Sequence, residues 1–130
     1  FARHDDCYDQ VRLLDVTGQE LVRINHRDGR ASAVGPADLQ DKSSRYYFQK
    51  AVALPPGEAY VSPLDLNMER GRIEIPYRPM LRLAAPAFDA SGERRGVVVL
   101  NYSGAVFGDR LDSLEGNAGE VHLVNEDGYW

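Results

Sequence analysis

The sequence has little of several residue types that would point to particular chemistries. It contains one cysteine in 130 residues, which excludes a disulfide framework and a cysteine-rich zinc site. Its 15 basic residues are outnumbered by 20 acidic ones, and the net charge of −5 argues against nonspecific nucleic-acid binding. No stretch approaches the roughly 20 apolar residues that a membrane-spanning helix needs. The remaining composition, 43% hydrophobic and 27% charged, is typical of one globular domain.

Motifs for catalysis and for metal binding are also missing from the sequence. There is no phosphate-binding loop, nucleophile elbow or zinc-protease motif, and the three histidines lie far apart. His4 and Cys7 have a spacing that suits a metal, but no second pair of ligands follows them. The segment 65–76 begins like a calcium-binding loop but lacks the required glycine and glutamate at its sixth and twelfth positions. We therefore expect no active site, no metal and no cofactor in this chain.

Alternating apolar residues predict a sheet of antiparallel strands. We expect the strands at 9–16, 19–26, 58–62, 72–88, 95–103 and 120–125, with Pro76 and Pro79 interrupting the fourth of them early. A helix capped by Ser43 or Ser44 should run to about Leu54, and a second one should span 105–114. This order of elements predicts an α+β fold in which the helices pack mainly on one side of a central antiparallel sheet.

The run 95–103 contains an asparagine that should be costly to bury. Val97, Val99 and Asn101 share one face of this strand, whereas Val98 and Leu100 share the other. A side-chain amide beside two valines is unfavourable unless it is hydrogen-bonded. We expect this face either to meet a polar ligand or water, or to be satisfied by a neighbouring loop.

The start of the first predicted helix combines one cation with three aromatic rings. Arg45 precedes Tyr46, Tyr47 and Phe48, so the segment can offer a positive charge to a carboxylate or phosphate and rings to enclose it. The alternative is that Tyr47 and Phe48 belong to the core and Arg45 is solvated. The residues alone leave both interpretations open.

Several motifs in sequence order resemble the extracytoplasmic Cache sensor domains of bacterial receptors. The run 8–25 resembles the opening strands of that family, and Ser43-x-Arg45-Tyr46-Tyr47-Phe48 resembles its pocket helix. The segment 58–67 is similar to the strand and loop that follow, and 79–97 is similar to the paired late strands. The resemblance covers about residues 8–112.

This resemblance implies a PAS-like sheet in the periplasmic part of an inner-membrane receptor. The receptor would cross the membrane through flanking segments outside this chain, would carry a histidine kinase, diguanylate cyclase or chemoreceptor output, and would be able to form a homodimer. Residues 1–115 would be the membrane-distal sensor domain, and 116–130 the start of a membrane-proximal unit. Because the chain begins at Phe1 and stops at Trp130 inside an expected strand, we expect it to be a segment of a longer protein.

The resemblance also implies a set of ligand-binding residues. Arg45, Tyr47 and Phe48 match the helix positions of amino-acid-binding members, and Tyr60 matches the strand position. The last-strand aspartate of those members is replaced by Asn101, which lacks the counter-charge for an ammonium group, and Asp65 is a candidate for that charge. We therefore expect a small polar ligand, anionic rather than an amino acid.

Three other interpretations stay open. They are an intracellular PAS-like domain for cofactor binding or dimerisation, a Cache spacer without ligand, and a fragment of an enzyme.

Overall fold

The structure is a computed structural model that describes residues 7–27, 29–108, 111 and 124. In chain order its elements are β1 (Tyr8–Asp15), β2 (Glu20–Arg27), β3 (Arg30–Ala33), the 3-10 helix η2 (Pro36–Asp38), α1 (Tyr46–Val52), β4 (Tyr60–Val61), β5 (Asp65–Leu66), β6 (Met68–Glu69), β7 (Arg72–Ile73), β8 (Pro79–Phe88) and β9 (Arg94–Ser103).

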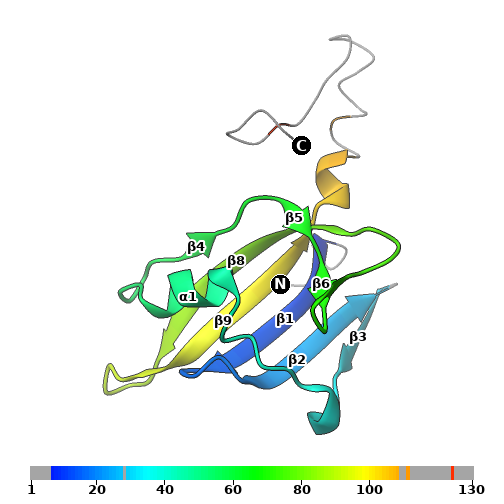
Figure 1. The fold of residues 1–130 in the computed structure, drawn as a ribbon. Helices are drawn as coiled ribbons and strands as arrows, with labels where there is room; N and C mark the ends of the chain where they lie inside the picture. Colours follow the sequence, from blue (N-terminus) through cyan, green and yellow to red (C-terminus); the bar gives the residue numbers. More distant parts are fainter. Residues whose placement is uncertain (1–6, 28, 109–110, 112–123, 125–130) are drawn as a thin grey trace.

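One antiparallel sheet forms the body of the fold. Its strands lie in the order β3-β2-β1-β9-β8-β4, and β5 pairs with the first two residues of β8. Helix α1 and the segment from β5 to β6 lie over the same face of this sheet (Figure 1). The strands β6 and β7 pair only with each other and form a separate hairpin, called the Glu69 hairpin below. The prediction of an α+β fold with its helix on one side of a central sheet is confirmed.

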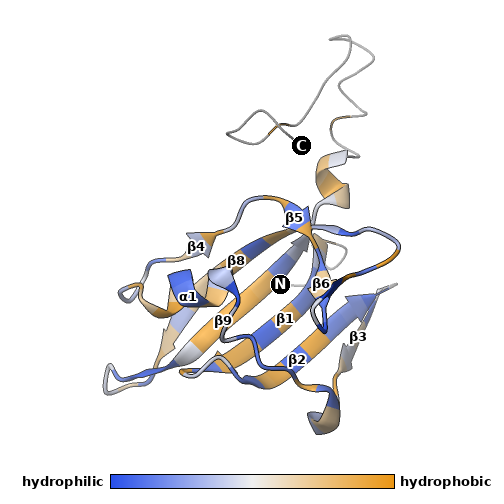
Figure 2. Ribbon diagram, in the orientation of Figure 1, coloured by the Kyte–Doolittle hydropathy of each residue, from blue (hydrophilic) through white to orange (hydrophobic). Residues whose placement is uncertain are grey.

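Side-chain alternation along the strands places the core between the sheet and α1. The fully buried apolar residues of the core are Leu14, Tyr47, Ala51, Ala84, Val97 and Val99, with Phe48 nearly so. On the opposite face Val11 and Val98 are more than a third exposed. Figure 2 shows apolar and polar bands alternating along the central strands. The predicted face of Asn101 is confirmed, because this residue is buried beside the two valines.

The N-terminus of α1 lacks the expected cap, and its C-terminus is bonded to an arginine of β9. The prediction of a serine cap is wrong, because Arg45 is the N-cap residue and no side chain caps the helix there. Residues 43 and 44 lie in a preceding turn, in which the Asp41 carboxylate accepts the Ser43 N–H at 2.8 Å. At the other end the Arg94 guanidinium donates to the carbonyl oxygens of Val52 and Leu54. A cation at this end suits the carbonyl groups that a helix leaves unpaired.

The expected long strand over 72–88 is wrong. The structure divides it into β7, in the Glu69 hairpin, and β8, in the main sheet, with Pro76 between them. Pro79 begins β8, where its missing N–H costs the sheet least. The short strand β3 was not predicted. Residues 105–108 are helical as expected, but the strand expected at 120–125 and the domain boundary at residue 115 lie outside the described residues, apart from Val124.

Candidate ligand-binding site

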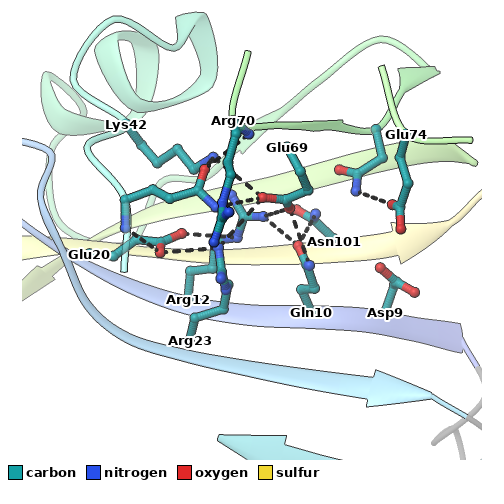
Figure 3. Close-up of polar contacts among 12 residues, drawn as sticks. Asp9, Gln10, Arg12, Glu20, Arg23, Lys42, Glu69, Arg70, Glu74 and Asn101 are labelled. Atoms are coloured by element: carbon teal, nitrogen blue, oxygen red, sulfur yellow. Dashed lines mark hydrogen bonds and ion pairs between the residues drawn. The ribbon is translucent and has the colours of Figure 1, made fainter. Parts of the chain in front are cut away.

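A layer of charged side chains lies between the sheet and the segments that cover it. Three cations in this layer, Arg12 of β1, Arg23 of β2 and Lys42 of the loop before α1, form a group that we call the cation cluster (Figure 3). Their side chains are 2%, 8% and 6% exposed. Cations are rarely buried to this degree without partners. The cluster must therefore be matched by carboxylates.

The Glu69 carboxylate, at the end of β6, is the first of these partners. Its Oε1 accepts hydrogen bonds from Arg12 Nη2 at 2.6 Å and from Gln10 Nε2 at 3.3 Å. Its Oε2 accepts from Gln40 Nε2 at 2.9 Å and lies 3.5 Å from Arg23 Nη1 and 3.8 Å from Lys42 Nζ. In Figure 3 Glu69 reaches the cluster from the side opposite the sheet. All three cations of the cluster thus face one carboxylate.

Glu20, at the start of β2, is the second partner and lies deeper. Its side chain is fully buried, with Arg12 Nε 3.5 Å from Oε1 and Arg23 Nη1 3.3 Å from Oε2. The Gln40 backbone N–H donates to Oε2 at 2.9 Å, which ties the loop before α1 to the sheet. Three cations therefore share two carboxylates, and the cluster carries an excess of one positive charge.

Burial and charge shift the pKa values of this group in opposite directions. Burial would raise the pKa of Glu69, but attraction to Arg12 and Lys42 and the hydrogen bonds from Gln40 and Gln10 together hold it below its usual 4.5. Burial, followed by repulsion from Arg12, lowers the pKa of Lys42 to about 8, although Glu69 and Glu20 oppose this. Burial therefore outweighs the attraction of the two carboxylates at Lys42.

The pKa of Lys42 predicts a dependence of stability on alkaline pH. Because the folded protein releases this proton near pH 8 and the unfolded chain near 10.5, the unfolded chain binds more protons between these values, and stability rises with pH there. We expect the free energy of unfolding of the wild type to rise, relative to Lys42→Met, by about 1 kcal/mol from pH 8 to pH 9. Urea unfolding measures this difference. The free energy of unfolding of Lys50→Met, which removes the exposed second lysine, should depend on pH as that of the wild type does. The same pH dependence in Lys42→Met and Lys50→Met would contradict the lowered pKa of Lys42.

Beside the cluster lies a cavity of about 370 Å³, called the Arg45 cavity. Its walls come from residues 40–42, 44 and 45 on one side and from Met68, Arg70 and Gly71 of the Glu69 hairpin on the other. The volume is at the lower end of the range for small-molecule pockets. Lys42 belongs both to this wall and to the cation cluster, so the two are contiguous.

The Arg45 guanidinium lacks a carboxylate partner among the described residues. It lies 5.9 Å from the ring centre of Tyr46 and 5.6 Å from that of Tyr47, and its Nη1 is 3.4 Å from the Met68 sulfur. Arg70, also in the wall, is paired with the exposed Asp38 at 2.7 Å. Asp41 brings a carboxylate to the wall, where it accepts the Ser43 N–H. Among the described residues of this wall, Arg45 is therefore the cation without an ion pair, whereas Lys42 and Arg70 each have one.

The remaining predicted residues lie around these groups. Tyr47 accepts a 3.4 Å hydrogen bond from Arg12, and its ring centre lies 5.6 Å from the Arg45 guanidinium and 5.4 Å from that of Arg82. Asp65 pairs with the buried Arg82 and accepts the Tyr46 hydroxyl at 2.6 Å. Burial, followed by this bond to Asp65, raises the pKa of Tyr46, which keeps its hydroxyl a donor.

Asn101 joins the network through its amide nitrogen, which donates to Gln10 Oε1 at 3.0 Å. Its Oδ1 is buried without a hydrogen bond in the structure. The sequence left open a ligand, water or a neighbouring loop as its partner, and the structure provides a side chain of the adjacent strand β1 as partner of the amide nitrogen.

Phe48 and Tyr60 lie away from the Arg45 cavity. Phe48 is 5% exposed within the apolar core, and Tyr60 packs against that core with its ring 6.4 Å from the ring centre of Tyr46. Of the six predicted site residues, Arg45 alone lines the Arg45 cavity. Tyr47 and Asp65 are linked to the Arg45 side chain through the Tyr46–Tyr47 pair of rings, whereas the lining of the cavity does not include Phe48, Tyr60 or Asn101.

The sequence reasoning missed the cation cluster and Glu69. A signal for Arg12 was present, because alternation placed it on the same strand face as the core residue Leu14. The same holds for Arg82, which stands between Met80 and Ala84 on the buried face of β8. Charged residues in register with core residues indicate either buried ion pairs or a polar site.

The described residues contain neither a group of metal ligands nor a helix that could span a membrane. In residues 7–27 and 29–108, with 111 and 124, no three histidine, cysteine, aspartate or glutamate side chains are grouped to hold a metal ion. No helix in the same part of the chain combines the length and the apolar character needed to cross a membrane.

Comparison with known proteins identifies the class of protein to which this chain belongs. The family model of the bacterial histidine kinase sensor domain matches residues 1–130, and the chain belongs to this family. No curated protein matches the chain. The family is one of non-catalytic sensor domains, and this chain is an extracytoplasmic sensor domain with a PAS-like fold. The class expected from the sequence resemblance is confirmed.

Two solved structures are similar to the chain. One is a domain of a sensory box/GGDEF family protein from Vibrio parahaemolyticus, with 33% identity, a TM-score of 0.70, and coverage of 78% of this chain. The other is the extracellular domain of a protein described as histidine kinase vpHK1S-Z8, with 31% identity, a TM-score of 0.74, and coverage of 84% of this chain. The matches cover only 38% and 39% of those two structures, respectively.

Proposed function

We propose that this sensor domain binds a small anion in the Arg45 cavity and that binding controls a histidine kinase or diguanylate cyclase elsewhere in a transmembrane receptor. The observation that carries the proposal is the Arg45 guanidinium, which lines a cavity without a carboxylate partner in the described part of the chain. Lys42, on the same wall, is buried, and its one ion pair among the described residues is the long one with Glu69, at 3.8 Å. A guest anion would satisfy both cations.

The surroundings of Arg45 favour recognition without chemical change of the guest. The Tyr47 ring lies 5.6 Å from the Arg45 guanidinium, Asp65 accepts the neighbouring Tyr46 hydroxyl, and Asn101 is bonded to Gln10 in the polar layer. Phe48 and Tyr60 belong to the core or pack against it. A guest in the cavity would contact both the loop before α1 and the Glu69 hairpin. It would therefore favour the arrangement of these two segments that encloses it. As part of this proposal, the receptor crosses the membrane through segments that flank this chain and forms a homodimer, as the family resemblance implies.

A binding screen tests this proposal. Thermal shift and calorimetry with carboxylates, phosphate, sulfate, amino acids and amines should identify an anion that stabilises the protein. Arg45→Met should weaken the binding of that anion by about 10- to 100-fold, because a charge-assisted hydrogen bond is lost. Arg30→Met, which removes an exposed arginine of β3, should leave it unchanged. Unaltered affinity in Arg45→Met would contradict the assignment, and the absence of any binding anion would favour a sensor without ligand.

A further inference from the structure

The Glu69 carboxylate occupies a site whose geometry is that of a bound carboxylate ligand. Its two oxygens receive Arg12 and Gln10 on one side and Arg23, Gln40 and Lys42 on the other. Five nitrogen groups from three segments of the chain thus converge on one planar group. Charge-assisted hydrogen bonds to both oxygens are the contacts by which a free carboxylate is recognised.

The framework that holds this carboxylate is more deeply buried than the carboxylate itself. The cation side chains are 2–8% exposed, whereas the Glu69 side chain is 24% exposed and approaches from outside (Figure 3). Glu20 remains fully buried beneath the cluster and pairs with Arg12 and Arg23 independently of Glu69. Withdrawal of Glu69 would therefore leave three buried cations with one carboxylate. This arrangement is an anion-binding site.

The segment that carries Glu69 is attached to the rest of the fold by side chains, such as the Arg70–Asp38 and Glu74–Arg27 ion pairs, and not by pairing with the main sheet. The strands β6 and β7 have two residues each and pair only with each other, outside the main sheet. The turn between them, Arg70 and Gly71, is exposed and forms part of the wall of the Arg45 cavity. A guest that enters this cavity meets the hairpin and, through Lys42, the cation cluster.

We propose that the cation cluster is a second carboxylate-binding site and that Glu69 is an exchangeable internal ligand of it. A free carboxylate that reaches the cluster displaces Glu69 and releases the Glu69 hairpin from the sheet. The inference rests on the proposed function, because the guest enters through the Arg45 cavity, and it specifies the guest as a carboxylate. A tethered group competes at an effective concentration in the millimolar range, so the wild type should bind simple carboxylates weakly.

Chemical rescue tests the site. Glu69→Ala removes the internal carboxylate, and its melting temperature should fall. Sodium acetate should restore it, with an apparent dissociation constant at least tenfold below that of the wild type, whereas sodium chloride at equal ionic strength should not. Sodium sulfate should be less effective than acetate. Recovery that chloride or sulfate produces equally well, or no recovery with acetate, would overturn the proposal.

Glu74→Ala is the matched control for this experiment. Glu74 lies just after β7 and is also paired, with Arg27 at 2.8 Å and with the Asn67 amide at 2.8 Å, but it does not contact the cation cluster. Its loss should destabilise the same region of the fold without creating a buried anion site. Acetate should therefore not restore Glu74→Ala. An acetate-specific recovery of both variants would show that the effect does not come from the cluster.

Hydrogen exchange of the wild type tests the displacement. Backbone amides of residues 67–74 should exchange faster as acetate is raised to about 100 mM, and those of β9 should not. Unchanged exchange in the hairpin would overturn the competition between Glu69 and free carboxylate. This outcome is distinct from a failure of the proposed function, which is measured as unaltered ligand affinity in Arg45→Met.

Discussion

Replacement of Glu20 by glutamine should lower the free energy of unfolding by about 3–5 kcal/mol. The substitution keeps the shape of the side chain and its acceptor for the Gln40 N–H, but it removes the fully buried charge that Arg12 and Arg23 share. Three buried cations would then face Glu69 alone. Breaking a buried ion pair on one side is costly because the remaining charge stays desolvated.

Urea unfolding at pH 7 measures this effect. Glu58→Gln, at an exposed glutamate, is the control and should stay within about 0.5 kcal/mol of the wild type. The double variant Glu20→Gln with Arg23→Gln should recover part of the loss, because it removes one cation together with one carboxylate. A loss below about 1 kcal/mol in Glu20→Gln would show that the cluster does not depend on this carboxylate.

The second large effect is expected at Gly96, where β9 passes β1. A Cβ atom built at this position would lie 1.9 Å from the Leu14 carbonyl oxygen and 3.3 Å from the Asp15 Cα. Both are backbone atoms of the central strand pair, in which Leu14 is opposite Val97. Gly96→Ala must therefore separate the two strands at the core, and we expect a loss of about 3 kcal/mol.

Thermal unfolding of Gly96→Ala and of Gly35→Ala checks this expectation. At Gly35 an added Cβ meets no atom within 4 Å, and the backbone has an ordinary extended conformation. This control should therefore unfold within a few degrees of the wild type. Equal melting temperatures for the two variants would contradict the close approach of β1 and β9.

The faces of the central strands could be predicted from the sequence because they depend on local alternation. Val97, Val99 and Asn101 were assigned to one face, and all three are buried in the structure. The helix after Ser44 was also predictable, although its serine cap was not observed. These features follow from neighbouring residues, so no knowledge of long-range contacts is needed to place them.

The Glu69 hairpin could not be predicted, because its position depends on residues far away in the chain. Glu69 binds Arg12, 57 positions earlier, and Arg23, 46 positions earlier. Its strands are two residues long, too short for an alternating pattern, and the sequence suggested only a polar excursion there. The position of Arg12 on the same strand face as Leu14 was a signal for a buried ion pair, but it could not show which carboxylate would approach.

The aromatic residues at the start of α1 divide between the two interpretations that the sequence left open. Phe48 lies in the core, as the structural interpretation held, whereas Arg45 lines a cavity and is not fully solvated. Tyr47 belongs to both the core and the polar layer, because its ring is buried in the core and its hydroxyl accepts a hydrogen bond from Arg12. The spacing of residues on a short helix did not separate these roles.

Side-chain NMR of the arginine Nε–H groups tests the central claim, that an anion binds at Arg45, most directly. The Arg45 signal is assigned by its absence in Arg45→Met, and the protein is titrated with each carboxylate of the panel. We expect a saturable shift of the Arg45 signal, whereas the signals of the exposed Arg30 and Arg72 should not change. A carboxylate that binds the protein while the Arg45 signal stays in place would contradict it.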